Sequence, residues 1–434
     1  MDIKVIDTNQ LGWISPCVLF LFACIPGLLF LSSGCFKMAP SSDLRPYDPG
    51  TFVGSRGHPL SDIELTHNLR QADYILIGET HTNPCDHQVQ TEVIHRLQDQ
   101  GLRVAVGLEM VPADMQPVLD RFNSGDLSLE ELENALEWRR IWGHDFSLYE
   151  PVLAAVQEAG FSLHGLNVRK GLLRSLRDKG RSGLSQEERE SMPERIIPVP
   201  PEQKDFLLEH FEEHRTFMDD KAGQADQERF FLVQALWDTQ MAVQARKVRR
   251  QTDLPVVILC GTGHAEYGWG IPYRLKALNP EASVLTIIPW RGDESPEDKA
   301  ADLFSFCPAQ HWSRLGFTME FNARGVEIVE VRDGSRATQA GMKPGDVLEM
   351  VGGKPLKEIM DLHHAAMKAV REGEPLPLTV VREGRELELK LKLDRPKSSS
   401  SFCPHKDVPS GSRKSEWGWP LSSIRYRTQL SQSP

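Results

Sequence analysis

The sequence has few cysteines, a deficit of positive charge and only one long apolar run. Seven of its 434 residues are cysteine and none forms a Cys-x-x-Cys pair, so the chain is neither a disulfide framework nor a zinc knuckle. Acidic residues outnumber basic ones, 61 against 50, which argues against a dedicated nucleic-acid binder. An otherwise ordinary composition excludes wholesale disorder and a polytopic membrane protein.

The apolar run lies near the amino terminus. Residues Trp13–Leu31 carry no charge, and the small residues Ser32, Ser33 and Gly34 lead directly to Cys35. This arrangement resembles a bacterial lipoprotein signal peptide. The resemblance implies that residues 1–35 are a signal peptide, that Cys35 is lipidated, and that the protein is anchored to a membrane of the cell envelope, on the periplasmic or outer-membrane side. A single uncleaved transmembrane anchor is the alternative.

Composition divides the rest of the chain into five parts. Residues 36–61 are rich in Pro and Gly and predict a tether. Residues 62–293 alternate strand and helix patterns, and residues 294–310 are a polar linker. Residues 311–393 form a small β-rich module, and residues 394–434 a disordered, Ser-rich basic tail. The four cysteines outside the signal peptide are widely spaced, so we expect them to be isolated thiols; the alternative is that two of them form one disulfide. They are Cys85, Cys260, Cys307 and Cys403.

Five short apolar runs in the first folded part are typical of buried parallel strands. Helical patterns separate them, including a long helical insertion over residues 203–250. The sequence therefore predicts an α/β fold with an open, mostly parallel sheet and right-handed crossovers. The runs are residues 74–77, 104–108, 161–163, 254–259 and 284–288.

Ionisable residues follow these strands. Glu79 and His81 follow the first, Glu109 the second, Arg169 the third and His264 the fourth. Because ligands gather beyond the carboxyl ends of parallel strands, we expect these side chains to share one edge of the sheet. Histidine and carboxylate can bind a transition metal, act as general acid and base, or hold an iron porphyrin whose propionates meet arginine.

The motif pair Gly78–His81 and Gly261–His264, with Glu109 between them, resembles the superfamily of Tiki metalloproteases, TraB-like proteins and erythromycin esterases. The ordered motifs over residues 65–290 are most similar to the ChaN-like haem-binding lipoproteins. That resemblance implies a membrane-anchored protein of haem or iron uptake. Its candidate cofactor-binding residues are His81, His87, Arg169, Asp238 and His264.

A metal-dependent hydrolase of the Tiki-like type, most simply a peptidase, is the alternative function. His81, Glu109 and His264 would hold a divalent metal ion, and Glu79 or Glu109 would act as the catalytic base. A pure adaptor with an inactive site is a third interpretation.

Three further residues of these motifs have structural alternatives. A buried Asp is rarely unpaired, so Asp238 on the long helix predicts a salt bridge to Arg169 or to a site histidine. Tyr149 and Tyr267 are candidate iron ligands because of the chemistry of the phenol group. The alternative is that each is a packed aromatic side chain.

The β-rich module opens with Arg314, Leu315, Gly316 and Phe317, and a small-residue turn over 337–346 follows. These motifs resemble a bacterial-type PDZ domain. The resemblance implies that backbone N–H groups of Leu315, Gly316 and Phe317 bind the terminal carboxylate of a protein or peptide. The strand beginning at Phe317 then accepts that peptide by β-augmentation. A PDZ fold that serves only as an internal scaffold is the alternative.

Overall fold

The structure is a computed structural model that describes residues 47–208, 224–292 and 295–393. The predicted signal peptide, Cys35 and the predicted tail lie outside the described residues. Within the described ranges, no helix has the length and apolarity needed to cross a membrane.

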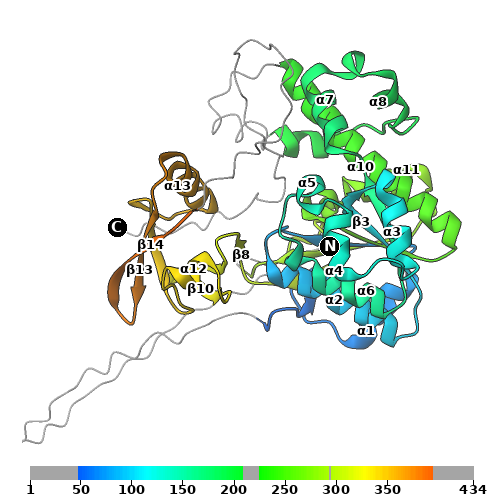
Figure 1. Ribbon diagram of the computed structural model, residues 1–434. Helices are drawn as coiled ribbons and strands as arrows, with labels where there is room; N and C mark the ends of the chain where they lie inside the picture. The colour runs from blue at the N-terminus through cyan, green and yellow to red at the C-terminus, as the bar shows by residue number, and fades with distance from the viewer. Residues whose placement is uncertain (1–46, 209–223, 293–294, 394–434) are drawn as a thin grey trace, which may run out of the picture. The chain divides into compact units, whose positions relative to one another are not determined.

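A seven-stranded sheet forms the first folded part (Figure 1), in the order β1-β7-β6-β2-β5-β3-β4. All neighbouring pairs are parallel except β1 with β7, so the mostly parallel α/β fold is confirmed. The strands are β1 (Phe52–Val53), β2 (Tyr74–Glu79), β3 (Ala105–Pro112), β4 (Ser162–Asn167), β5 (Val256–Gly261), β6 (Val284–Trp290) and β7 (Leu303–Phe306).

The five predicted strands correspond to β2 to β6. Strands β1 and β7 come instead from the segments expected to be tether and linker, and they pair with each other at the sheet edge. With two and four residues respectively, they are too short to give a recognisable apolar pattern.

Helices cover both faces of this sheet because its strands are apolar on both sides. Ile75 and Ile77 pack against residues of α2 and α6, whereas Tyr74 and Leu76 pack against residues of α10 and α11. The helices are α1 (Asp62–Gln71), α2 (Pro84–Asp99), α3 (Gln116–Asn123), α4 (Leu129–Ala135), α5 (Trp138–Ile141), α6 (Glu150–Glu158), α7 (Lys170–Lys179), α8 (Gln186–Glu190), α10 (Gln224–Thr252) and α11 (Ile271–Leu278).

The start of α2 matters for the site because it directly follows the first strand-end motif. The side chain of Asn83 accepts a hydrogen bond from the Cys85 N–H at 3.0 Å, and Pro84 occupies the first helical turn. Both are favoured at helix starts, where backbone N–H groups lack helical partners. The chain therefore turns from β2 into α2 within four residues.

The β-rich module folds around its own apolar core, and its second sheet has the order β14-β13-β11-β10-β9-β8, with β12 beside β11. All of its pairs are antiparallel. Its elements are β8 (Gln310–Ser313), β9 (Phe317–Asn322), β10 (Gly325–Val331), α12 (Arg336–Gln339), β11 (Val347–Val351), β12 (Lys354–Pro355), α13 (Ile359–Glu372), β13 (Leu376–Arg382) and β14 (Arg385–Leu391).

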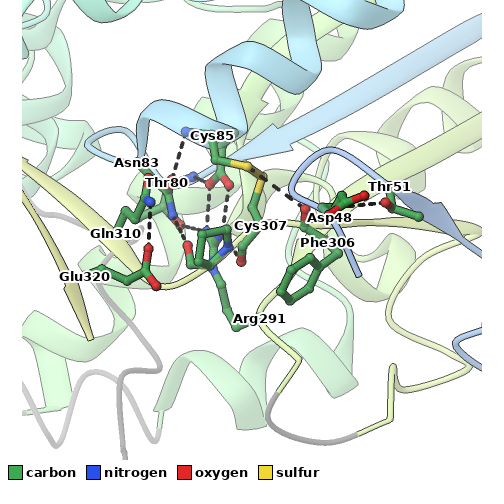
Figure 2. The surroundings of a disulfide bond; sticks show 12 residues. Asp48, Thr51, Thr80, Asn83, Cys85, Arg291, Phe306, Cys307, Gln310 and Glu320 are labelled. Carbon is green, nitrogen blue, oxygen red and sulfur yellow. Dashed lines mark hydrogen bonds and ion pairs between the residues drawn. A yellow bond between two sulfur atoms is a disulfide. The ribbon is translucent and has the colours of Figure 1, made fainter. Parts of the chain in front are cut away.

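One disulfide joins Cys85 at the start of α2 to Cys307 after β7 (Figure 2). Both residues are buried, and Cys260 is a buried free thiol. Nearby, Arg291 forms a two-pronged ion pair with Asp86, with both contacts at 2.7 Å. The disulfide fixes the segment after β7 against the first turn of α2, and the ion pair fixes the residue after β6 against the same turn.

Candidate functional site

The central strand β5 sets the geometry of the site. It pairs with β2 so that Glu79 lies opposite Gly261, and with β3 so that Leu108 lies opposite Leu259. Glu79 and Glu109 therefore reach the same edge of the sheet, and each is at most 1% exposed. Buried carboxylates need charged or hydrogen-bonding partners, and the partners of these two are histidines.

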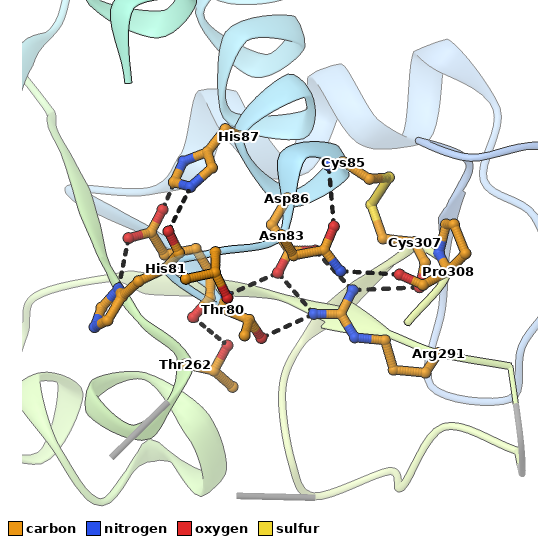
Figure 3. A network of polar contacts seen from close by, with 12 residues as sticks. Thr80, His81, Asn83, Cys85, Asp86, His87, Thr262, Arg291, Cys307 and Pro308 are labelled. Carbon is orange, nitrogen blue, oxygen red and sulfur yellow. Dashed lines mark hydrogen bonds and ion pairs between the residues drawn. A yellow bond between two sulfur atoms is a disulfide. The ribbon is translucent and has the colours of Figure 1, made fainter. Parts of the chain in front are cut away.

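Glu79 lies between two histidines (Figure 3 labels both). Its Oε1 is 2.8 Å from Nδ1 of His81, and its Oε2 is 2.8 Å from Nδ1 of His87. The Tyr149 hydroxyl donates to Oε1 at 2.9 Å, and Gln90 donates to Oε2 at 3.3 Å. Burial alone would raise the pKa of Glu79, but the charge of His87 and the hydrogen bonds with His81 and His87 hold that pKa well below its ordinary value.

His87 carries the compensating positive charge. Its burial opposes ionisation, yet the charge of Glu79 raises the pKa of His87 above its ordinary value. Glu79 and His87 therefore form a buried ion pair within the motif Gly78–His87. His81 is the histidine nearer to solvent, 8% exposed against 2% for His87.

A second buried cluster surrounds His264. Its Nδ1 lies 2.6 Å from Oδ1 of Asp238, and its Nε2 lies 3.4 Å from Oε1 of Glu109. Burial lowers the pKa of His264, but the two carboxylates outweigh it and raise that pKa to about 10. Asp238 is also 3.5 Å from the Arg274 guanidinium, and the Gly261 N–H donates to Glu109 at 2.6 Å.

The two motif histidines therefore differ in what they offer a ligand. His81 uses Nδ1 toward Glu79, and its Nε2 makes no hydrogen bond with the described residues. His264 directs both ring nitrogens at carboxylates and is held as an imidazolium. A histidine whose Nδ1–H donates to a carboxylate presents its other nitrogen as a metal ligand, so His81 has the chemistry of a ligand and His264 that of a fixed positive charge.

A glycine makes this arrangement of His81 sterically feasible. A Cβ built on Gly261 would lie 2.9 Å from Cε1 of His81, closer than carbon atoms pack without displacement. The second motif thus needs its glycine so that the imidazole of the first can lie against β5.

The remaining predicted residues are distributed as follows. Asp238 forms its salt bridge with His264 and not with Arg169, which is exposed and paired with Asp114. Tyr149 is buried, and burial together with the charge of Glu79 raises its pKa well above the ordinary value. Tyr267 stacks on Trp269 with ring centroids 4.4 Å apart, and its hydroxyl donates to Glu297.

Three neighbours of His81 were not predicted as site residues. The rings of Trp142 and His144 lie 4.7 and 4.9 Å from its ring, and Lys170 donates to the Trp142 carbonyl oxygen. Burial, reinforced by the charge of His81, lowers the pKa of His144 to about 2. Trp142 and His144 lie on a loop that does not follow a strand, so the strand-end pattern did not select them, whereas Lys170 is the residue after Arg169 at the start of α7.

Across residues 47–208, 224–292 and 295–393, no three His, Cys, Asp or Glu side chains are arranged to hold a metal ion. The site carboxylates and imidazoles are directed at one another in ion pairs. The metal-ligand roles of His81, Glu109 and His264 therefore stay predictions, as do the catalytic roles of Glu79 and Glu109.

Fold and site define a class of protein, an α/β domain with a buried histidine–carboxylate site followed by a PDZ module. Comparison with family models is consistent with this. Residues 65–275 match the family described as haem-binding uptake, Tiki superfamily, ChaN, and residues 313–393 match the PDZ domain. The chain thus contains a ChaN-type domain of the Tiki superfamily followed by a PDZ domain, as the motifs predicted.

Individual relatives are similar over parts of the chain. ChaN of Campylobacter jejuni, solved with cofacial haem binding, is 21% identical with a TM-score of 0.46, over 58% of this chain and 95% of that one. The periplasmic pH-dependent serine endoprotease DegQ of Escherichia coli (strain K12) is 35% identical over 78 residues, which are 18% of this chain. The serine protease Do-like HtrA of Bacillus subtilis (strain 168) is 32% identical over 78 residues. The match spans 17% of the length of each of these two proteases.

Replacing Glu79 with Gln tests the first cluster. The substitution leaves buried His87 without its counter-charge, and breaking a buried ion pair in this way costs about 3–5 kcal/mol. We expect the urea midpoint of Glu79→Gln to fall accordingly, measured by circular dichroism. The matched control Glu130→Gln changes an exposed carboxylate and should leave the midpoint almost unchanged. Equal midpoints for the two variants would contradict the ion-pair assignment.

The raised pKa of His264 predicts a pH dependence of stability. Because the folded-state pKa of about 10 lies above the ordinary value of 6.5, the stabilisation is complete below the ordinary value and is lost as pH rises through about 10. Between neutral and alkaline pH, the free energy of unfolding should decline more steeply in the wild type than in His264→Gln. Urea unfolding at several pH values measures both slopes, and parallel slopes would show that His264 is not held protonated.

Proposed function

We propose that this chain is a lipid-anchored haem-binding protein of the cell envelope, with a role in haem or iron uptake, whose PDZ domain recruits a protein partner. The proposal is carried by the coincidence of a ChaN-type domain over residues 65–275 with a strand-end histidine, His81, that keeps one ring nitrogen free of hydrogen bonds to described residues.

The residues around His81 fit an iron porphyrin. His81 would hold the iron of a bound haem through Nε2, and the haem would supply the iron centre. Glu79 accepts the Nδ1–H of His81, which fixes the tautomer and makes the ring a stronger donor to metal. Lys170, which contacts Trp142 beside His81, would supply positive charge for the propionates, as would Arg169 on exchanging its ion pair with Asp114 for one with a propionate.

Haem titration tests this proposal. We expect a Soret band when haem is added to the wild type, and at least about tenfold weaker binding by His81→Ala, as for loss of a metal-ligand interaction. The control His67→Ala removes an exposed histidine of α1 and should bind as the wild type does. Absence of a spectral change in the wild type would refute haem binding.

One observation favours a metal-dependent hydrolase as the second candidate. Oε1 of Glu109 is buried and, among the described residues, accepts no hydrogen bond and contacts His264 in an ion pair at 3.4 Å, as expected of a carboxylate oxygen that can receive a cation or a water molecule. Elemental analysis of the purified protein separates the two candidates. Stoichiometric divalent metal with metal-stimulated cleavage of unfolded protein, and no porphyrin spectrum, would favour the hydrolase.

Anchoring through Cys35 has its own test. Cells grown with radioactive palmitate should label the wild-type protein and place it in the membrane fraction, because two or more acyl chains give stable anchoring. The variant Cys35→Ser should lose the label, whereas the control Cys24→Ser, which changes a cysteine inside the apolar run, should keep it. Label retained by Cys35→Ser would contradict lipidation at this residue.

A further inference from the structure

The strand predicted to accept a peptide in the PDZ domain has both edges occupied. Strand β9 pairs with β10 on one edge and with β8 on the other, where Gln310 lies opposite Glu320 and Trp312 opposite Thr318. The Phe321 N–H extends this ladder by donating to the Ala309 carbonyl oxygen at 2.9 Å. Because β-augmentation requires a free edge, a segment of the chain itself stands where a peptide would bind.

The loop predicted to bind a carboxylate is occupied in the same way. The Leu315 N–H donates to the Ser313 hydroxyl at 3.2 Å, and the Gly316 N–H donates to the Ser313 carbonyl oxygen at 2.8 Å. Ser313 is the last residue of β8 and is 5% exposed. Its two oxygens thus take donors that were expected to bind the two oxygens of a terminal carboxylate.

Strand β8 also carries a histidine that interacts electrostatically with α13, one of the two helices of the PDZ domain. Burial and then the charge of His363 on α13 lower the pKa of His311 to about 4, so His311 is within electrostatic range of that helix. Side-chain contacts add to the β8–β9 ladder, since Gln310 donates to Glu320 at 2.8 Å (Figure 2).

Contacts on the far side of β8 hold it in place. The Trp312 N–H donates to the Thr82 carbonyl oxygen at 2.7 Å, and His311 Nδ1 lies 2.9 Å from the Thr82 hydroxyl. The Trp312 indole donates to Asp145 at 3.2 Å. Upstream of β8, Asn83 donates to the Pro308 carbonyl oxygen at 2.9 Å (Figure 3), next to the Cys307 disulfide.

We propose that β8 is an intramolecular ligand that closes the PDZ groove, so that a partner with a free C-terminal carboxylate binds only by displacing it. The inference goes beyond the proposed function because it does not require haem binding. Displacement of β8 removes two hydrogen-bonding contacts from Thr82, the residue after His81. Entry of a partner at the PDZ domain therefore alters the loop that carries the site histidine.

The segment itself supplies the probe. A fluorescent peptide with the sequence of residues 308–313 (Pro-Ala-Gln-His-Trp-Ser) and a free carboxyl terminus is titrated into the full chain and followed by fluorescence anisotropy. In the variant Trp312→Gly/Ser313→Pro, the internal strand loses the indole that donates to Asp145 and the Ser313 hydroxyl that accepts from the Leu315 N–H. We expect this variant to bind the peptide at least tenfold more tightly than the wild type, and the C-terminal amide at least tenfold more weakly than the acid.

Two further variants keep the test decisive. Cys85→Ser/Cys307→Ser leaves the sequence of β8 intact and removes only the covalent link upstream, so its affinity should lie between those of the wild type and the first variant. Adding Gly316→Val, at a position with φ of 93°, should abolish binding in either background. The proposal is overturned if the wild type binds the peptide as tightly as both opened variants, or if neither opened variant binds it.

Discussion

The parallel pairing of β5 with β2 and β3 is the constraint on which the site depends. Parallel strands end at the same edge of a sheet, and the register places Glu79 beside Gly261, while Glu109 lies in β3, on the other side of β5, one residue past the Leu108–Leu259 pair. The motif residues after three strands thereby meet although almost two hundred residues separate the first from the last. Helices on both faces bury the site residues at this edge. A buried charge is costly in free energy unless it is paired, so each charge of the site needs a partner.

The buried charges of the site are paired with opposite charges nearby, because an unpaired buried charge would cost much free energy. Glu79 is matched by His87, and Glu109 and Asp238 are matched by His264 and Arg274. The charges of His87 and His264 hold the pKa values of Glu79 and Glu109 below their ordinary value, and the carboxylates in turn raise the pKa values of these two histidines. His81 is the exception among these histidines, because its partner Glu79 already faces His87 and, within the described part of the chain, one of its ring nitrogens forms a hydrogen bond while the other forms none. That asymmetry separates a residue that can receive a ligand from residues that hold the site together.

The short loop between β2 and α2 serves two purposes. Its first residues place His81 against Gly261, and its next residues, Thr82 and Asn83, bind the segment that leads into the PDZ domain. Asn83 also caps α2, so the same residue starts a helix and fixes Pro308. Because Thr82 contacts β8 and is the residue next to His81, displacement of β8 would act directly on this loop.

The sequence by itself determined the five central strands, the residues that follow them, and the PDZ module, because apolar periodicity, glycine-containing turns and ordered motifs are local patterns. It also predicted that Asp238 forms a salt bridge, since a buried carboxylate must be paired. Only the tertiary structure decided the choice of His264 over Arg169 as that partner, the pairing of Cys85 with Cys307, and the occupation of the β9 edge by β8. Each of these depends on distances between groups that are remote in sequence (Tyr149 lies 70 residues from Glu79, Cys307 lies 222 from Cys85) and on burial, which sets protonation. Neither quantity is encoded in a local pattern, whereas strand ends and turns are.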